Sequence, residues 1–301
     1  MKSITQKNKL LRPGLGFDVF NTVFMLIIII VTLYPFWYCL IGSLNEGYDY
    51  IKGGVFLLPR AFSWENYRIV LREERLITAY RVTIFRTVIG TVTHLIFTAV
   101  FAYGITRKYL LGRSIYLKYA MFTMYFGGGL IPTYLLYINL NLINSFWVYI
   151  IPSLFSFYHV IILQSFFKTI PEALNESAMI DGAGEYRIFF SIIVPLSKPV
   201  MAAIALFTGV GHWNAYFDSM VFTTSTSLQT VQVYLMRIIR EVEFAAKMAA
   251  ESADLIPGLR RPNAETIKLA TMIVATAPIL AIYPFLQKYF VKGIMMGSIK
   301  G

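Results

Sequence analysis

Charged side chains are scarce in this chain of 301 residues, of which Asp, Glu, Lys and Arg together make up 14%. A soluble globular protein carries about 25% of such residues. Hydrophobic residues reach 57%, and the mean hydropathy is +0.61. This balance excludes an ordinary soluble domain and predicts a protein whose main solvent is lipid.

Residues that build disulfides and metal sites are equally few. Cys39 is the one cysteine, so no disulfide can form within the chain. His94, His159 and His212 are far apart in the sequence, and neither an HExxH nor a CxxC pattern is present. We therefore expect no metal site.

Motifs for nucleotide binding and catalysis are also missing. The sequence has no GxxxxGK[ST] phosphate-binding loop, and Gly209-x-Gly211 lacks the third glycine of a dinucleotide fingerprint. No Ser/His/Asp or paired-carboxylate constellation supports the alternative of an integral-membrane enzyme. We expect no catalytic residue and no cofactor in this chain.

Positive charge is in excess, with 27 Lys and Arg residues against 16 Asp and Glu residues and a formal net charge of +11. In a soluble protein this excess would suggest nucleic acid. Here the basic flanks of membrane spans explain much of it. We expect contact with membrane lipid and no nucleic-acid partner.

Long apolar segments are abundant. A membrane span needs roughly 20 mostly apolar residues, and the first segment that qualifies is too long for the core of a cleaved signal peptide. The sequence predicts an all-α integral membrane protein with six transmembrane helices. They are Phe17–Gly42, Thr83–Thr106, Lys118–Tyr137, Ser145–Phe167, Pro199–Phe222 and Thr266–Phe290.

Basic residues in the short connections set the expected orientation. They gather in the N-terminal tail, after the second and fourth spans, and at the C-terminus. By the positive-inside rule, both termini should then be cytoplasmic. We expect a cytoplasmic tail over residues 1–16 and a single transmembrane domain over residues 17–301.

Two local patterns each allow two interpretations. Ser63 can cap a helix from Trp64 to about Tyr80, lying on the outer membrane surface or against the bundle. A solvated charged connector is the alternative there. The glycines at positions 127–129, just before Pro132, either break the third span or serve close helix packing.

The segment from Phe166 to Pro199 is too polar for a span and too apolar for a linker. Pro171 favours the start of a first helix, and Asp181-Gly182 predicts a turn. A second short helix then ends at Val194-Pro195. The segment should form a helical elbow on the cytoplasmic side, with an acidic and small-residue surface that can insert into a groove on a partner.

This segment resembles the EAA loop of the membrane permeases of binding-protein-dependent ABC importers. In that family the motif is Glu-Ala-Ala, three residues, Gly, nine residues and Ile-x-Leu-Pro. Here it stands as Glu176-Ser177-Ala178, then Gly182, then Ile192-Ile193-Val194-Pro195, with Ser for one Ala and Val for Leu. Further runs, such as YFGGGLIPTYLL, GVGHWNAYFDSMVF and FxxIIxPLSKP, are similar to the carbohydrate branch of these permeases. The resemblance covers roughly residues 15–301.

The resemblance implies a type I importer fold in a bacterial inner membrane. A second, related permease would complete the pathway as a heterodimer, and two partner ATPase subunits would bind ATP and Mg. An external binding protein would deliver an oligosaccharide, possibly an acidic one. The coupling loop would be residues 168–198, with the tail at 293–301 also near the ATPases. Its coupling residues, by this matching, are Glu172, Glu176, Ala178, Asp181, Gly182 and Pro195.

Aromatic and polar residues near the fifth span suit a glycan path, because aromatic rings stack on sugar faces and amides and carboxylates hydrogen-bond hydroxyl groups. An interfacial aromatic belt is the alternative. Arginines at 72, 75, 81 and 86 could attract an acidic glycan, although a solvated or docking face suits them better. The candidate substrate-path residues are Trp213, Asn214, Tyr216 and Asp218, with Gln164 and Tyr134 as weaker ones.

Two transport alternatives stay open. A secondary transporter driven by an ion gradient usually needs an acidic or other ionisable group inside its spans. The expected spans have no acid near mid-depth, since Asp18 and Asp218 lie toward their ends. An ABC permease for a non-sugar solute is the second alternative. The C-terminal run YPFLQKYFVKGIMMGSIKG is typical of the carbohydrate branch and therefore favours a sugar.

Overall fold

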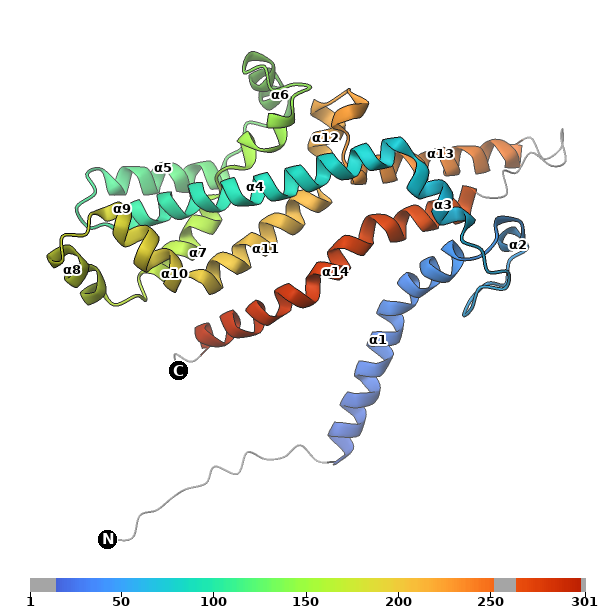
Figure 1. Ribbon diagram of the computed structural model, residues 1–301, viewed down its shortest axis with the longest axis horizontal. Coiled ribbons are helices and arrows are strands. Elements are labelled where there is room, and N and C mark those ends of the chain that lie inside the picture. Colours follow the sequence, from blue (N-terminus) through green and yellow to red (C-terminus); the bar gives the residue numbers. More distant parts are fainter. Residues whose placement is uncertain (1–14, 252–263, 299–301) are drawn as a thin grey trace, which may run out of the picture. The chain divides into compact units, whose positions relative to one another are not determined.

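The computed structural model describes residues 15–251 and 264–298, and within these ranges the regular structure is helical (Figure 1). Three of the described helices are individually long and apolar enough to cross a membrane, and up to six spans result if each sharply bent helix pair is one span. The expected tails at 1–16 and 293–301 lie almost entirely outside the residues whose side chains the structure describes. The chain divides into two compact units, 1–69 with 258–273 and 70–257 with 274–301.

The first unit is dominated by helix α1, Leu15–Ser43, which contains the expected first span. Its large apolar side chains from Phe17 to Trp37 are exposed, as suits a helix surrounded by lipid or by partner helices. The unit also holds α2, Gly47–Ile51, most of α3, Glu65–Arg72, and the start of α14, Ala264–Ser298.

Buried amides hold the connections of this first unit together. The Asn66 side chain donates to the carbonyls of Ser43 and Asn45 at 2.8 and 2.9 Å and accepts from the Thr266 hydroxyl at 2.9 Å. Its buried polar atoms are therefore paired. The expected helix from Trp64 to Tyr80 is wrong in its extent, because α3 ends at Arg72 and an extended residue separates it from the next helix.

The second unit is organised around the long helix α4, Glu74–Thr106. Its buried positions recur along one face, and half of them are small, including Ala79, Gly90, Thr98 and Ala102. Small side chains let neighbouring helices approach closely within a membrane. Along this face α4 packs against α7, Phe157–Phe167, and α11, Lys198–Asn214 (Figure 1).

The third, fourth and fifth expected spans are bent or interrupted, not single straight helices. α5, Arg113–Tyr125, turns by 117° into α6, Leu130–Asn139. The break includes Gly129, whose φ of 85° suits glycine. The fourth expected span begins with two short 3₁₀ turns, Phe146–Tyr149 and Ile151–Ser153, which bend by 47° into α7. The fifth stops at Asn214 and resumes as α12, Phe217–Phe222.

The expected elbow is present as a chain of short helices at the Thr106 end of α4 (Figure 1). It consists of α8, Glu172–Ile180, α9, Glu185–Ile188, a π-helical turn, Phe189–Ile193, and α10, Val194–Leu196. Pro171 lies one position before α8. The remaining elements are the 3₁₀ turn Thr226–Leu228, α13, Val231–Glu251, and the rest of α14.

Candidate functional site

The turn of the elbow is fixed by backbone hydrogen bonds that end α8. The Ala183 amide donates to the Ala178 carbonyl at 2.9 Å, and the Gly182 amide donates to the Met179 carbonyl at 3.0 Å. This pair of bonds is the Schellman ending of a helix, which places one residue in the left-handed region. Gly182 occupies that position with a φ of 79°, which glycine adopts without the steric cost of a β-carbon.

The outward face of the elbow is open to solvent. No residue of α8 is buried, and Glu172, Glu176 and Asp181 are exposed. Large apolar side chains are exposed beside these carboxylates, with Ile180 at 86% and Tyr186 at 83%. A mixed acidic and apolar surface on a protruding helix is typical of a contact with a partner protein.

The inward face of the elbow is anchored in the helical core. Ile188, Phe189 and Ile193 are buried, and they belong to one apolar cluster with side chains of α4, α7 and α11. Ala178 and Ala183 pack on the edge of the same cluster. The elbow is therefore part of the folded bundle on one side and free on the other.

A cavity of about 400 Å³ with several ionisable side chains in its lining lies farther along the second unit. Seven separate elements line it: α4, α6, both 3₁₀ turns of the fourth expected span, α7, α11 and α12. Its ionisable and aromatic lining residues include all three histidines of the chain, and they are Arg86, His94, Tyr137, Tyr149, Phe155, His159, His212, Asp218 and Phe222.

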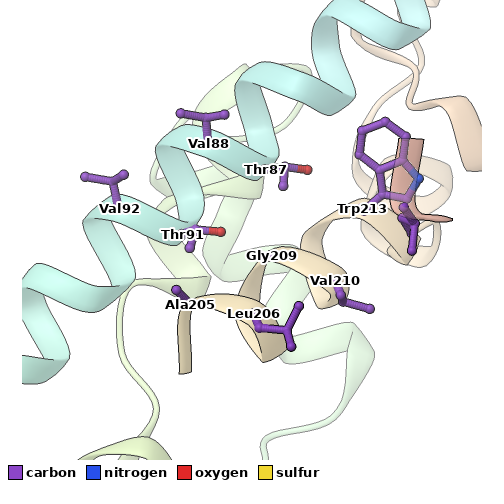
Figure 2. A pocket seen from close by; sticks show the side chains of 10 residues that line it. Thr87, Val88, Thr91, Val92, Ala205, Leu206, Gly209, Val210 and Trp213 are labelled. Atoms are coloured by element: carbon purple, nitrogen blue, oxygen red, sulfur yellow. The ribbon is translucent and has the colours of Figure 1, made fainter. Parts of the chain in front are cut away.

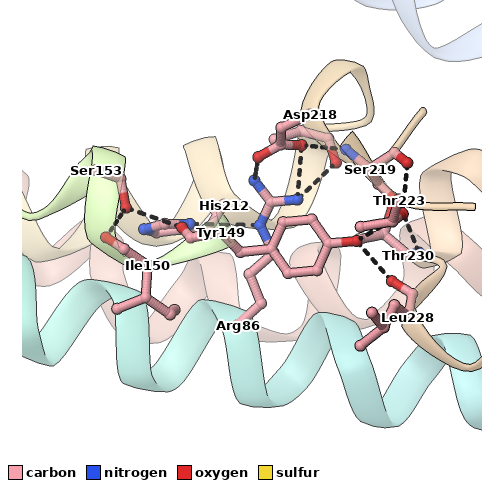
Figure 3. A network of polar contacts seen from close by, with 11 residues as sticks. Arg86, Tyr149, Ile150, Ser153, His212, Asp218, Ser219, Thr223, Leu228 and Thr230 are labelled. Atoms are coloured by element: carbon pink, nitrogen blue, oxygen red, sulfur yellow. Dashed lines mark hydrogen bonds and ion pairs between the residues drawn. The ribbon is translucent and has the colours of Figure 1, made fainter. Parts of the chain in front are cut away.

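An ion pair between Arg86 and Asp218 forms the centre of the lining (Figure 3). One guanidinium nitrogen, Nη1, donates to Asp218 Oδ1 at 3.0 Å, and Nη2 pairs with Oδ2. The Arg86 side chain is 3% exposed and that of Asp218 is 26% exposed. The expectation that Arg86 lies on a solvated face is therefore wrong, because the two-pronged pairing satisfies its charge inside the bundle.

Two further side chains hold the Arg86 guanidinium in place (Figure 3). It lies 4.6 Å from the centre of the Tyr149 ring, and its Nε donates to His212 Nδ1 over a long 3.5 Å. The Tyr149 hydroxyl in turn donates to the Leu228 carbonyl at 2.6 Å. A cation over an aromatic face gains electrostatic stabilisation from the ring.

His94 and His159 form a second polar pair on the cavity wall. His94 Nδ1 lies 2.6 Å from the Ser153 carbonyl, and its Nε2 lies 2.8 Å from His159 Nδ1. Because a carbonyl oxygen only accepts, His94 Nδ1 carries the donated proton. With neutral rings, His159 then donates to His94, and the remaining His159 nitrogen, Nε2, is left as an acceptor.

Of the predicted substrate-path residues, Asp218 lines this cavity. Trp213 instead faces a separate apolar hollow of about 290 Å³ between α4 and α11 (Figure 2). Its indole nitrogen donates to the Ala275 carbonyl at 3.3 Å. Asn214 and Tyr216 are exposed next to the end of α11, and Gln164 is buried in α7 outside the cavity lining. The role of these residues in the substrate path stays a prediction.

Comparison with known proteins decides the family. No family model matches the sequence. Over 290 residues the chain is 37% identical to protein LplC of Bacillus subtilis (strain 168), covering 96% of this chain and 97% of the relative. It is 36% identical over 285 residues to the polygalacturonan/rhamnogalacturonan transport system permease protein YtcP of the same organism, covering 95% and 98%. The chain belongs to the family of sugar ABC transporter permeases.

A solved structure agrees with this membership. The permease matches a chain from the crystal structure of a bacterial ABC transporter involved in the import of the acidic polysaccharide alginate. The TM-score is 0.82 and the identity is 31%, with 91% of this chain and 96% of that chain covered. The permease is thus a multi-pass membrane protein with the fold of an ABC importer subunit, and its relatives are transport components.

The sequence held one signal for the cavity that we did not use. Arg86 and His94 are eight residues apart inside the second expected span, so two helical turns place them on one face of α4. Ionisable residues within a span are functional candidates by default. His159 and His212 also lie inside expected spans, the fourth and the fifth, but no local pattern placed them beside Arg86 and His94, because they come from other helices.

The chemistry of the permease cavity is suited to binding. Among the described residues, no group of three or more His, Cys, Asp or Glu side chains is placed to hold a metal ion. The lining instead offers nitrogen and oxygen atoms that donate and accept hydrogen bonds, together with tyrosine faces. Sugar hydroxyl groups and carboxylates are the ligands that such a lining can hydrogen-bond.

Proposed function

We propose that this permease forms one half of the pathway of an ATP-driven importer for oligosaccharides that carry carboxylates. A second, related permease completes the pathway, two ATP-binding subunits bind ATP and Mg, and an external binding protein delivers the substrate. The complex lies in a bacterial inner membrane with both termini of this chain in the cytoplasm. This chain itself contributes no hydrolytic chemistry.

The observation that carries the substrate proposal is the cavity built around Arg86. Beside the Arg86–Asp218 pair, the imidazole nitrogens and Tyr137 offer hydrogen-bonding groups of a kind that suits the hydroxyls and carboxylates of uronate sugars. Two of the relatives support the same class, since their names refer to polygalacturonan and to the acidic polysaccharide alginate. Membership of the ABC permease family speaks against the ion-gradient alternative.

The substrate proposal is tested with the reconstituted complex of both permeases, the ATP-binding subunits and the binding protein. ATP hydrolysis is measured with a panel of neutral and uronate oligosaccharides of matched length. We expect uronate oligosaccharides to stimulate ATP hydrolysis and uptake, and neutral ones to fail. Stimulation by neutral oligosaccharides alone would overturn the uronate assignment but leave the importer assignment standing.

The coupling proposal assigns ATPase docking to the elbow, with Glu172, Glu176, Ala178, Asp181, Gly182 and Pro195 as its residues. What supports it is the solvent-open face of α8 and the left-handed turn at Gly182 that aims this face outward. Replacing Gly182 by Val adds a β-branched side chain where φ is 79°. The left-handed conformation costs such a residue about 1–2 kcal/mol.

We therefore expect Gly182→Val to abolish ATP-driven uptake while the permease still reaches the membrane. Gly184→Val is the matched control, since Gly184 has an ordinary φ of −73° and open space around it. Uptake by each variant is measured in proteoliposomes loaded with ATP. Normal uptake by Gly182→Val would show that the elbow does not couple ATP hydrolysis to transport.

A further inference from the structure

One carboxylate of the elbow is held by three side chains of another element. Tyr103 donates its hydroxyl to Glu185 Oε2 at 2.5 Å, and Arg107 Nη2 lies 2.9 Å from the same oxygen. The Tyr109 hydroxyl donates to the other oxygen, Oε1. Both oxygens of Glu185 are thus engaged by the end of α4 and the loop that follows it. We call this group, Tyr103, Arg107, Tyr109 and Glu185, the Glu185 clamp.

The Glu185 clamp is built more firmly than a surface ion pair. The Arg107 guanidinium lies 4.2 Å from the centre of the Tyr103 ring, and its side chain is 14% exposed. The neighbouring pair of Lys108 and Glu172 also joins this loop to the elbow, but these side chains are 80% and 61% exposed. The Glu185 side chain is 40% exposed, and several charge-assisted hydrogen bonds to one carboxylate are stronger than a single exposed pair.

The clamp joins the elbow to the helix that carries the cavity. α4 runs unbroken from Glu74 to Thr106 and bears Arg86 and His94 on the cavity wall. Arg86 lies 21 positions before Arg107, which at 1.5 Å per residue is about 30 Å along the chain. A helix of this length transmits a displacement of its end to the cavity as a nearly rigid rod.

The covalent route from the elbow to the cavity is less direct. It passes through the π-helical turn at Phe189–Ile193 and then through a 79° bend into α11. Single π-helical turns inside helices are frequent at functional sites. The buried side chains Ile188, Phe189 and Ile193 attach the elbow to the core by apolar packing, which is non-directional.

We propose that Glu185 is the positioning residue that makes α4 move with the elbow when the ATP-binding subunits close. This inference rests on the proposed coupling function of the elbow. The clamp gives the elbow a directional attachment to α4, so closure of the partners shifts Arg86 and His94 together with the elbow. Without the Glu185 carboxylate, the elbow still docks but moves past the end of α4.

The test measures cavity opening in the assembled importer, independently of any sugar. A cysteine reporter, Ser156→Cys, is placed on the cavity wall in a Cys39→Ala background, since Ser156 lines the cavity, is partly exposed and Cys39 is the native thiol. Right-side-out vesicles holding the complete complex are loaded with ATP or left without it. A membrane-impermeant maleimide added outside then reports ATP-dependent access to the cavity, and ATP hydrolysis is measured in parallel.

We expect Glu185→Gln to keep ATP hydrolysis within a small factor of the parent but to lose ATP-dependent labelling. The ratio of labelling to hydrolysis should fall about tenfold, the factor that one charged hydrogen bond corresponds to. A merely structural defect would lower assembly and hydrolysis as well and would leave this ratio unchanged. Glu74→Gln, which removes the same charge from the exposed far end of α4, is the matched control.

Tyr109→Phe provides a second, milder variant in case Glu185→Gln assembles poorly. It keeps the pair of Arg107 and Glu185 and removes one donor, so a partial fall in the ratio is expected. Adding Tyr109→Phe to Glu185→Gln should cause no further loss, because both act through the same contact.

The outcomes separate this inference from the proposed function. If the reporter parent gains labelling with ATP and Glu185→Gln behaves like Glu74→Gln, the clamp has no coupling role and the importer assignment stands. If the reporter parent itself shows no ATP dependence in a complex that hydrolyses ATP, the proposed function fails, and the clamp fails with it.

Discussion

Helix α4 and the residue that caps its end, Arg107, form two arginine–carboxylate pairs that differ in their surroundings. Arg86 and Asp218 meet on the cavity wall, with side chains 3% and 26% exposed, whereas Arg107 and Glu185 meet at the elbow, 14% and 40% exposed. The first guanidinium packs on Tyr149 and the second on Tyr103. The same chemical pair is thus used twice along one helix, at two depths of burial.

The difference in burial determines what each pair can do. A buried pair must stay together, because separating its charges away from water is strongly unfavourable. The Arg86–Asp218 pair therefore fixes the shape and charge of the cavity. The side chains of a half-exposed pair can separate, because water replaces the contacts that are lost. The Glu185 clamp therefore suits a contact that bears force in every transport cycle.

The largest expected effect comes from breaking the buried pair. Asp218→Asn leaves the Arg86 guanidinium without its charge partner inside the bundle, and removing one partner of a buried pair costs about 3–5 kcal/mol. We expect a clear drop in the thermal unfolding temperature of the permease in nanodiscs. The control is the double variant Arg86→Met with Asp218→Leu.

In that double variant no unpaired charge remains, and replacing a buried ion pair by apolar residues is often neutral for stability. Most of the lost stability should therefore return while uptake stays low. A single Asp218→Asn variant as stable as the parent would contradict the view that this pair is structurally fixed.

A smaller effect is expected from crowding the cavity wall at Gly90. A methyl group there would lie 2.4 Å from His212 Nε2 and 2.6 Å from its Cε1, so the buried ring must move away from its place beside Arg86. Overpacking of this kind costs about 1–3 kcal/mol. Gly90→Ala should lower both the unfolding temperature and uptake.

Gly104→Ala is the control on the same helix, near the elbow. A methyl group at Gly104 meets no atom within 4 Å, and Ala in a helix interior is favoured over Gly by about 0.5–1 kcal/mol. This variant should be at least as stable as the parent. Equal losses for Gly90→Ala and Gly104→Ala would mean that the cavity wall is no more tightly packed than the elbow end.

The smallest effect is expected at the exposed pair of Lys108 and Glu172. Their side chains are 80% and 61% exposed at a distance of 3.0 Å, and exposed pairs contribute about 0–1 kcal/mol. Lys108→Gln should leave the unfolding temperature nearly unchanged, and added salt should mask what difference remains. A loss as large as that of Asp218→Asn would show that exposure is a poor guide to these pairs.

Much of the fold was predictable from local patterns. The apolar runs indicated the helices α1, α4 and α14, and the Asp181-Gly182 turn indicated the elbow. The bends inside the third, fourth and fifth expected spans were missed or left open. Hydropathy reports how apolar a segment is, whereas a bend depends on how its neighbours satisfy the freed backbone groups.

The candidate site was less predictable than the fold. Asp218 was singled out for its residue type and lies on the cavity, whereas Trp213 was singled out on the same grounds and faces a different hollow. These two residues are five positions apart around the end of α11. Which face of a helix end looks into a cavity depends on where the chain breaks, and here it breaks between Asn214 and Phe217.

The amino-acid sequence by itself determined that the chain spans a membrane and that the elbow turns at Asp181-Gly182, where glycine is favoured. Both follow from local physics: the transfer of apolar side chains into lipid, and the backbone angles that a β-carbon disfavours. Only the tertiary structure decided that three scattered histidines share a cavity with Arg86 and that Glu185 meets the end of α4. Contacts between residues tens of positions apart depend on helix packing, which no local pattern encodes.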